Sequence, residues 1–321
     1  MDGNSNTTKE QRAKGLRARL DALSRGPSLR TPGMSSSARE APQAVGKREK
    51  GPARQVSPTP IVYRRDLPRR DAPPPDSGEN KRSEVSLEEA VNGRVVHSSG
   101  GKAFVISSRV DDLEGAELFS RTFVERMCAD ESALCRRVAS ACGLETVTPH
   151  DIIFTDIETT GLGISPLFLI GTMVWETNGF EVRQHLARTY AEEPGVIALF
   201  IETCAAKKLL VTFNGKSFDL PFIRTRAAAN GIPFGMRSAH FDLLHECRRI
   251  WKHVLPDCRL KTLEALVCNR PRYGDISGEE IPDAYHAYVR TEDATQIVEI
   301  LRHNMLDLVT LADLMTRFPR H

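Results

Sequence analysis

The stretch FTDIETTGL, residues 154–162, places two carboxylates at the end of an apolar segment. Residues 152–154 are apolar, which is typical of a strand inside a sheet. Asp156 and Glu158 follow two residues apart, and side chains at i and i+2 of a strand point to the same face. Because two such carboxylates repel each other, we expect a positively charged group between them. The rest of the sequence indicates what that group is.

The first 85 residues differ in charge from the rest of the chain. They contain 18 Lys and Arg against 10 Asp and Glu, a net charge of +8, whereas the other 236 residues carry −6. This tail is rich in Pro, Ser, Gly and Arg, and such a segment buries too little apolar area to offset its ordering entropy. We predict a disordered basic tail (1–85), a small hairpin-plus-helix lead-in (86–150) and one main domain (151–317).

Two features of the tail each have two interpretations. Leu16, Leu20 and Leu23 share one helical face within residues 7–25. This segment is either a frayed short helix or a helix that docks on a protein partner. The positive charge either keeps a linker soluble or makes weak, sequence-independent contacts with nucleic acid.

The cysteines and the hydropathy pattern concern the compartment. Seven cysteines, an odd number without a Cys-x-x-Cys pair, indicate reduced thiols and a cytoplasmic protein. Met1 is followed by polar residues, so no signal peptide is expected. No uncharged apolar run reaches a membrane-spanning length, so no membrane association is expected.

The order of elements after residue 86 predicts an α/β fold. A hairpin and a helix come first, and Asn178-Gly179 then separates two apolar runs, which is a strong hairpin signal. The strands expected in the main domain are 152–156, 167–175, 180–189, 209–213 and 239–241, and the helices are 194–206, 220–230, 242–251, 260–267 and 292–315. We expect a mixed five-stranded sheet with helices on its faces.

Two further acids accompany later elements. Asp219, in FNGKSFDLPF, falls in the first turn of a helix, and Asp307, in HNMLDLV, lies on the last long helix. Taken singly, Asp219 fits a helix N-terminus and Asp307 a solvated face. Taken with Asp156 and Glu158, they indicate two hard divalent cations, Mg²⁺ or Mn²⁺, held by carboxylate oxygens. Such a pair of ions suits in-line phosphoryl displacement.

These motifs resemble a known group of nucleases. DIETTGL, FNGKSFDLP and HNMLD resemble the three exonuclease motifs of the DEDD superfamily, which has the ribonuclease H-like fold. HFDLLHECRRIW, CRLKTLE and DISGEEIPDAY resemble more closely the YprB-like family of predicted exonucleases. The resemblance covers residues 151–317. It implies a metal-dependent 3′–5′ exonuclease, acting on single-stranded nucleic acid, whose carboxylates are Asp156, Glu158, Asp219 and Asp307.

The third motif departs from the superfamily pattern. The superfamily has a Tyr four residues before the final Asp or a His five residues before it, and here His303 stands four residues before Asp307. A histidine titrates near neutral pH, so His303 is the candidate general base. The alternative is that His303 caps or packs in the helix.

Seven further residues are candidate substrate contacts. They are Thr159, Thr160, Gly161, Leu162, Asn214, Lys216 and Lys261. By the resemblance, the first four form a turn whose N–H groups and leucine meet a terminal nucleotide; otherwise they are an ordinary turn. The asparagine either positions Asp219 or substrate or belongs to an Asn-Gly turn. The lysines contact phosphates or are solvated.

The competing function is a non-catalytic nucleic-acid-binding module on the same fold. Loss of one acid would indicate it, and all four acids are present. A metal-dependent phosphatase would need a Gly-rich phosphate loop, which the sequence lacks. No residue stands out as a reader of the 2′-hydroxyl, so DNA and RNA both stay open as substrates.

Overall fold

The computed structural model describes residues 85–112, 116–128, 133–177 and 179–319. The predicted basic tail up to residue 84, with its candidate helix at 7–25, lies outside these residues, so both stay predictions. Among the residues described, no helix is both long and apolar enough to cross a membrane.

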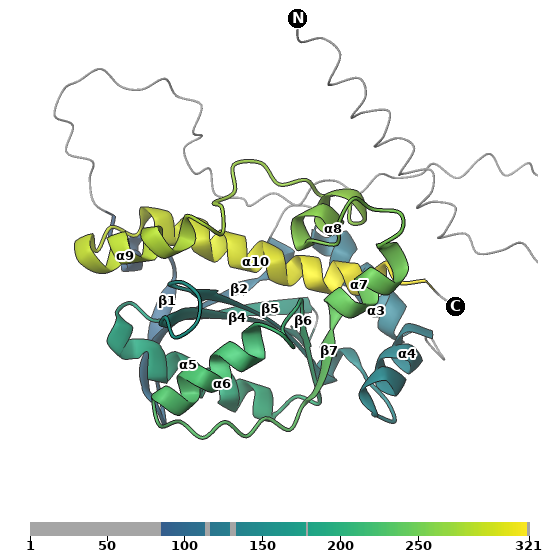
Figure 1. Cartoon of the computed structure of the whole chain (residues 1–321), viewed down its shortest axis with the longest axis horizontal. Helices are drawn as coiled ribbons and strands as arrows, with labels where there is room; N and C mark the ends of the chain where they lie inside the picture. Colours follow the sequence, from purple (N-terminus) through teal and green to yellow (C-terminus); the bar gives the residue numbers. More distant parts are fainter. Residues whose placement is uncertain (1–84, 113–115, 129–132, 178, 320–321) are drawn as a thin grey trace, which may run out of the picture. The chain divides into compact units, whose positions relative to one another are not determined.

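A mixed sheet forms the centre of the fold (Figure 1). From edge to edge its strands are β1 (Gly93–Ser98), β2 (Gly101–Arg109), β5 (Gly179–Leu186), β4 (Leu167–Glu176), β3 (Ile152–Thr159), β6 (Leu209–Thr212) and β7 (Ala239–Asp242). Strands β1, β2, β5, β4 and β3 pair antiparallel in that order, whereas β6 pairs parallel with both β3 and β7. The predicted α/β class with a mixed sheet and flanking helices is confirmed.

Within the described residues the sheet has seven strands, so the predicted number of five was wrong. Strands β3 to β7 are the five expected ones. The hairpin β1–β2, expected to precede the domain, continues its sheet because β2 pairs with β5, with Phe104 opposite Leu186. Phe104 is buried in the same apolar core as Leu186. An apolar alternation identifies a strand but not the strand beside it, which is why the sequence missed this pairing.

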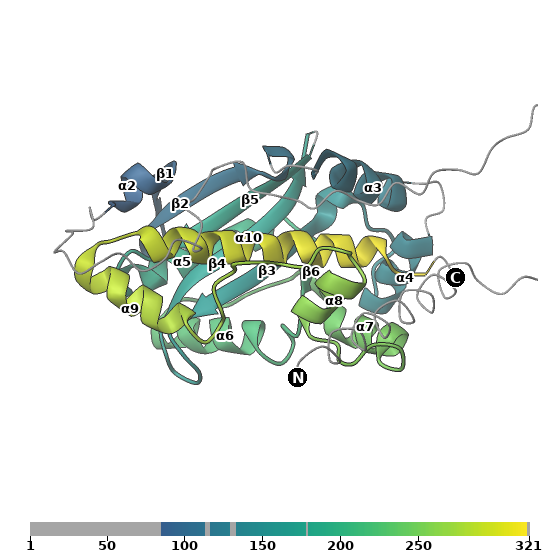
Figure 2. The same cartoon turned by 90° about the horizontal axis from the view of Figure 1, so that it is seen from above.

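Helices cover both faces of the sheet (Figures 1 and 2). Helices α5 (Glu193–Ala205) and α6 (Asp219–Ala229) lie on one face, and α10 (Thr295–Thr316) runs across the other. The other α-helices of the described residues are α2 (Leu87–Ala90), α3 (Ala116–Cys128), α4 (Ala133–Cys142), α7 (Leu243–Trp251), α8 (Leu260–Leu266) and α9 (Ile281–Thr291). Most of α10 is buried, including polar residues such as His303, Asn304 and Thr310.

The two faces of β3 meet different layers. Ile153 and Ile157 belong to the apolar core that also holds residues of α5 and α6. Asp156 points to the opposite face, where it contacts Asn304 of α10. The alternation expected from the sequence therefore places the acid pair in the layer between β3 and α10.

The helices near the end of the chain differ most from expectation. The sequence does not predict α9, and the last helix starts at Thr295 rather than at 292. The chain turns between these helices because Glu292 adopts a left-handed backbone, with a φ of 60°, and ends α9. A single turn-forming Glu gives no clear signal, since Gly or Asn usually occupies such a position.

Candidate active site

Three elements bring the four predicted acids together. Asp156 and Glu158 lie on β3, Asp219 is the first residue of α6, and Asp307 lies in α10. Their charges interact. The pKa of Asp156 is raised well above its usual range, mainly by burial and then by the negative charges of Asp307, Glu158 and Asp219. These four carboxylates, the acid cluster, therefore lie close enough for their charges to interact, with Asp156 on the side of the sheet that α10 covers and Asp219 at the start of α6.

The pKa values of the acids in the cluster are raised because too little positive charge lies near them. The pKa of Glu158 is raised to about 8, mainly by burial and then by the negative charges of Asp307 and Asp219. The positive charge of nearby His303 opposes this shift. Burial, followed by Asp242 and Asp307, raises the pKa of Asp219 to about 7. A cation among these oxygens would favour their ionised forms and reverse the shifts.

Asp307 has a cationic partner that the sequence analysis missed. Arg272, from the loop between α8 and α9, donates from Nη2 to Asp307 Oδ1. Arg272 is buried and also pairs with Glu264 and, at 3.4 Å, with Asp275. It lies in a loop without periodicity, so no sequence pattern placed it beside the acids.

His303 is held between two carboxylates. Its Nδ1 donates to Asp275 Oδ2 at 2.8 Å, and its Nε2 lies 3.6 Å from Asp307 Oδ2. Burial by itself lowers the pKa of His303, but the hydrogen bond to Asp275 and the charges of Asp307 and Glu158 outweigh it and raise the pKa. Lys261, a predicted phosphate contact, reaches this group, because its Nζ lies 3.7 Å from Asp275 Oδ2.

The turn after β3 is held by its own hydrogen bonds. Thr159 Oγ1 donates to Gly161 O at 2.7 Å, and both N and Oγ1 of Thr160 donate to Pro166 O. Gly161 has a φ of 148°, a region that favours glycine. Leu162, at the tip of the turn, has an exposed fraction of 81%. An apolar side chain thus projects from a well-bonded turn four residues beyond Glu158.

A buried ion pair anchors the far side of that turn. Arg226 Nη1 donates to Ile164 O at 2.7 Å, and Glu193 Oε1 accepts from Leu167 N at 2.8 Å. Arg226 and Glu193 are paired at 2.6 Å. Helices α5 and α6 therefore fix the backbone next to Leu162, and Ile164, 82% exposed, adds a second apolar tip that the sequence analysis did not single out.

A buried carboxylate shapes the turn that leads into α6. Asp242 accepts from the backbone N–H groups of Asn214 at 2.8 Å and Lys216 at 3.0 Å. Asn214 has a φ of 65°, which asparagine tolerates better than most residues. Asn214 and Lys216 are exposed residues, and it is their backbone that bonds to Asp242. This turn sets the start of α6 and hence the position of Asp219.

The donor chemistry of the cluster fits hard divalent cations. Asp156, Glu158 and Asp219 supply carboxylate oxygens, which Mg²⁺ and Mn²⁺ prefer. Burial is the main cause of their raised pKa values, and a bound cation would compensate for it by stabilising the ionised carboxylates. As the side chains stand, no group of three or more His, Cys, Asp or Glu in the described part of the chain has an arrangement that holds a metal ion.

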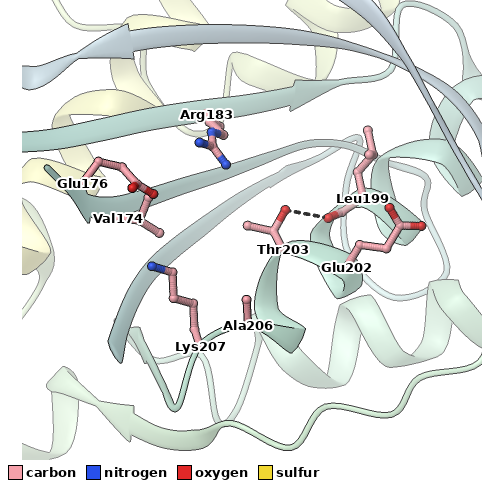
Figure 3. Close-up of a pocket in the computed structure, with 8 residues that line it drawn as sticks. All are labelled: Val174, Glu176, Arg183, Leu199, Glu202, Thr203, Ala206 and Lys207. Carbon is pink, nitrogen blue, oxygen red and sulfur yellow. Dashed lines mark hydrogen bonds between the residues drawn. The ribbon is translucent and has the colours of Figure 1, made fainter. Parts of the chain in front are cut away.

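A separate hollow of about 350 Å³ lies on the α5 side of the sheet (Figure 3). Residues of β4, β5 and the end of α5 line it, among them Arg183 and Lys207. Arg183 pairs with Glu181 at 2.8 Å, and Lys207 Nζ donates to His150 O at 3.0 Å. Both cations are thus engaged, and Asp156 points to the other face of the sheet, toward Asn304 of α10.

Comparisons with known proteins agree with this arrangement. A sequence model described as the RNase_H superfamily matches residues 153–318, which include all four acids. The "Uncharacterized protein YprB" of Bacillus subtilis (strain 168) is 32% identical over 170 residues, which are 51% of this chain and 41% of that protein. The matched part is thus about two fifths of that relative's length.

One solved structure is similar to part of this chain. The family B DNA polymerase from the hyperthermophilic archaeon Pyrobaculum calidifontis has a TM-score of 0.43 and 17% identity to this chain. The similarity covers 51% of this chain and 24% of the polymerase, and at that TM-score it supports no functional conclusion.

Proposed function

This chain belongs to the RNase H superfamily, and we propose that it is a metal-dependent 3′–5′ exonuclease that hydrolyses phosphodiester bonds at a single-stranded 3′ end. The observation that carries the proposal is the convergence of Asp156, Glu158, Asp219 and Asp307 from β3, α6 and α10. Of the four acids, Asp219 is buried and the other three are partly buried. Like charges held together out of water destabilise the fold, and such groups are typical of functional sites.

The four carboxylates are the donors for two Mg²⁺ or Mn²⁺ ions. When bound, such ions supply an activated water and neutralise charge on the scissile phosphate. The carboxylates position these ions, and their mutual repulsion is relieved on binding. Arg272 already contacts Asp307 Oδ1 and His303 lies beside Asp307 Oδ2. An oxygen of Asp307 that binds a metal ion is therefore shared with one of these two residues.

His303 is the proposed general base. Asp275 accepts the proton of Nδ1, which leaves Nε2 as the basic nitrogen on the side of Asp307. In this arrangement Nε2 takes a proton from the attacking water, and Asp275 fixes the plane of the ring. Asp275 is a residue to which the sequence analysis gave no role, although it lies within the quoted DISGEEIPDAY.

The substrate contacts follow from the exposed groups around the acids. Leu162 packs on the terminal base, and the backbone of Thr159 and Gly161 meets the terminal nucleotide. The N–H of Thr160, predicted to do the same, is already bonded to Pro166 O. Packing against a base face requires an unpaired base, which favours a single-stranded end. Lys261, next to Asp275, contacts a phosphate as a point charge. The exposed residues Asn214 and Lys216 are further, weaker candidates.

One observation favours a second candidate function. The guanidinium of Arg272 already neutralises Asp307, so the cluster carries less negative charge than four free carboxylates. A non-catalytic nucleic-acid-binding module would keep such a pair permanently. The two functions differ in one outcome: the module binds nucleic acid without shortening it.

The test uses the full chain with 5′-labelled single-stranded DNA and RNA in Mg²⁺ or Mn²⁺. We expect a ladder of products that shorten from the 3′ end, and the nucleic acid that gives it identifies the substrate. Asp156→Asn, purified in the same way, is the control for contaminating nucleases. A 3′-labelled substrate should release its label in the first product. Binding without shortening by the wild-type protein would overturn the enzyme proposal in favour of the binding module.

A further inference from the structure

One position of the sheet next to the acids has no side chain. Gly171 of β4 lies opposite Asp156 of β3 and opposite Gln184 of β5, so the three residues form one rung on the face that α10 covers. Asn304 of α10 fills the space above the glycine. A Cβ atom at position 171 would lie 2.0 Å from Asn304 Oδ1, so this close approach of helix and sheet requires glycine.

The hydrogen bonds of Asn304 connect the rung. Its Nδ2 donates to Asp156 Oδ2 at 2.9 Å and to Asp156 O at 3.3 Å. Its Oδ1 accepts from Gln184 Nε2 at 3.0 Å, and the same Nε2 donates to Leu301 O at 2.7 Å. A carbonyl oxygen only accepts, so Leu301 fixes which end of the Gln184 amide faces α10. Asn304 must then turn its oxygen to Gln184 and its NH₂ group to Asp156.

From this geometry we infer that Asn304, oriented by Gln184, is a positioning residue for Asp156. Asn304 has no exposed surface and Gln184 is 2% exposed, so water does not compete for these bonds. The NH₂ group holds one carboxylate oxygen of Asp156 and leaves the other for a metal ion. The inference rests on the proposed function, in which Asp156 is a metal ligand.

The competing explanation is that Asn304 only satisfies polar groups where α10 packs on the sheet. Mn²⁺ affinity separates the two, because packing alone does not change it. Asn304→Leu keeps a similar volume and removes the bonds to Asp156. We expect Mn²⁺ binding to the full chain, measured by calorimetry, to weaken about 10–100-fold, the usual effect of losing a partner that orients a metal ligand. The kcat should fall with little change in KM for nucleic acid.

A matched control exists on the other side of the sheet. Asn230 Nδ2 donates to Glu193 Oε2 at 3.1 Å and to Arg226 O at 2.9 Å, so Asn230→Leu also removes two amide hydrogen bonds. We expect this control to lower the melting temperature but to leave Mn²⁺ affinity at the wild-type value. A loss of Mn²⁺ affinity as large as that of Asn304→Leu would show a general effect of stability and overturn the inference.

The glycine gives a second route to the same question. Gly171→Ala should displace Asn304 and weaken Mn²⁺ binding without touching any carboxylate. In Gly171→Ala/Asn304→Ala the clash is gone but the bond is not restored, so melting temperature should recover while Mn²⁺ affinity should not. Recovery of both, or wild-type Mn²⁺ affinity in a folded Asn304→Leu, overturns the inference. Absence of Mn²⁺ binding by the wild-type chain instead overturns the proposed function and the inference with it.

Discussion

The guanidinium of Arg272 is bonded to the carboxylate of Asp307, and the two side chains are 7% and 14% exposed. Arg272 lies in the loop before α9 and Asp307 lies in α10, so the bond connects this loop to α10. The same guanidinium pairs with Glu264 and Asp275. One buried cation therefore serves carboxylates from α8, the loop and α10.

Removing this cation should be strongly destabilising. Arg272→Ala leaves three carboxylates, 2–14% exposed, without their guanidinium, and breaking a buried ion pair from one side costs about 3–5 kcal/mol. Urea unfolding measures the loss. The control is Arg121→Ala, because Arg121 and Glu125 form a pair in which both side chains are about 70% exposed, and such pairs contribute about 0.3–0.5 kcal/mol. Similar losses in the two variants would mean that the Arg272 pairs do not stabilise the fold.

Neutralising the acid pair of β3 should abolish cleavage but not folding. Asp156→Asn and Glu158→Gln each remove a charged metal ligand while they keep the size of the side chain. We expect no product ladder from either variant and circular dichroism spectra like that of the wild type. Robust turnover by the double variant would contradict the two-metal proposal.

The raised pKa values also predict how stability depends on pH. The pKa of Glu158 is about 8 and that of Asp219 about 7, against ordinary values of 4.5 and 3.8. Because the folded state holds these protons more tightly than the unfolded state, this contribution is full below the ordinary values and is lost as pH rises through 7 to 8. In the presence of a chelator, we expect the melting temperature to fall between pH 5 and 8.

Two comparisons assign that fall to the acid cluster. Glu158→Gln removes one titrating group, so the melting temperature of this variant should depend less on pH. Added Mg²⁺ should raise the melting temperature of the wild type most at the alkaline end, where the carboxylates are ionised. A pH dependence that is the same in Glu158→Gln and in the wild type would show that Glu158 is not the group that titrates.

Local patterns in the sequence placed three of the acids on their elements, and the resemblance to the exonuclease motifs added Asp307. Asp156 and Glu158 share a face since a strand alternates its side chains, and Asp219 starts a helix where the sequence places Pro221 near its beginning. Their mutual proximity depended on the fold class, which the order of strands and helices indicated. The structure then brought Asp307 to the same place through α10.

The partners of these acids could not be found in the same way. Arg272 and Asp275 lie in a loop, where no period relates residue number to direction. Asn304 did have a signal that the sequence analysis did not use. It is a polar residue inside a buried helix, and Gly171 interrupts a run of large apolar residues in β4. Relating the two requires the contact between α10 and the sheet, which depends on tertiary structure.

The charge of the first 84 residues should matter for long substrates. Deleting residues 1–84 removes a net charge of +8 and keeps Val85, whose carbonyl accepts from Ala294 N at 2.9 Å. We expect near-normal turnover on short substrates, weaker binding to long ones and a shallower dependence of binding on salt, because fewer cations contact phosphates. An unchanged salt dependence after the deletion would place the tail away from the nucleic acid.

His303 should be required for turnover rather than for binding. His303→Ala removes the nitrogen that faces Asp307, and loss of a general base usually costs about two to four orders of magnitude. We expect turnover to fall by about two to three orders of magnitude, with little change in the binding of substrate or Mn²⁺. His303→Tyr restores the superfamily's other residue at this spacing. It should retain more activity than alanine if the position of the group matters more than its basicity.

A substitution of Asp275 tests the same role of His303 through the pH dependence of activity. Asp275 holds the Nδ1 proton and is among the groups that raise the pKa of His303. Asp275→Asn keeps an acceptor but removes the charge, so the pKa of His303 should fall and its neutral, basic form should persist to lower pH. The acid limb of the activity profile should therefore move to lower pH in Asp275→Asn and flatten in His303→Ala. If alanine at position 303 leaves both turnover and the pH profile unaltered, His303 is not the base, and the water loses its proton without help from this side chain.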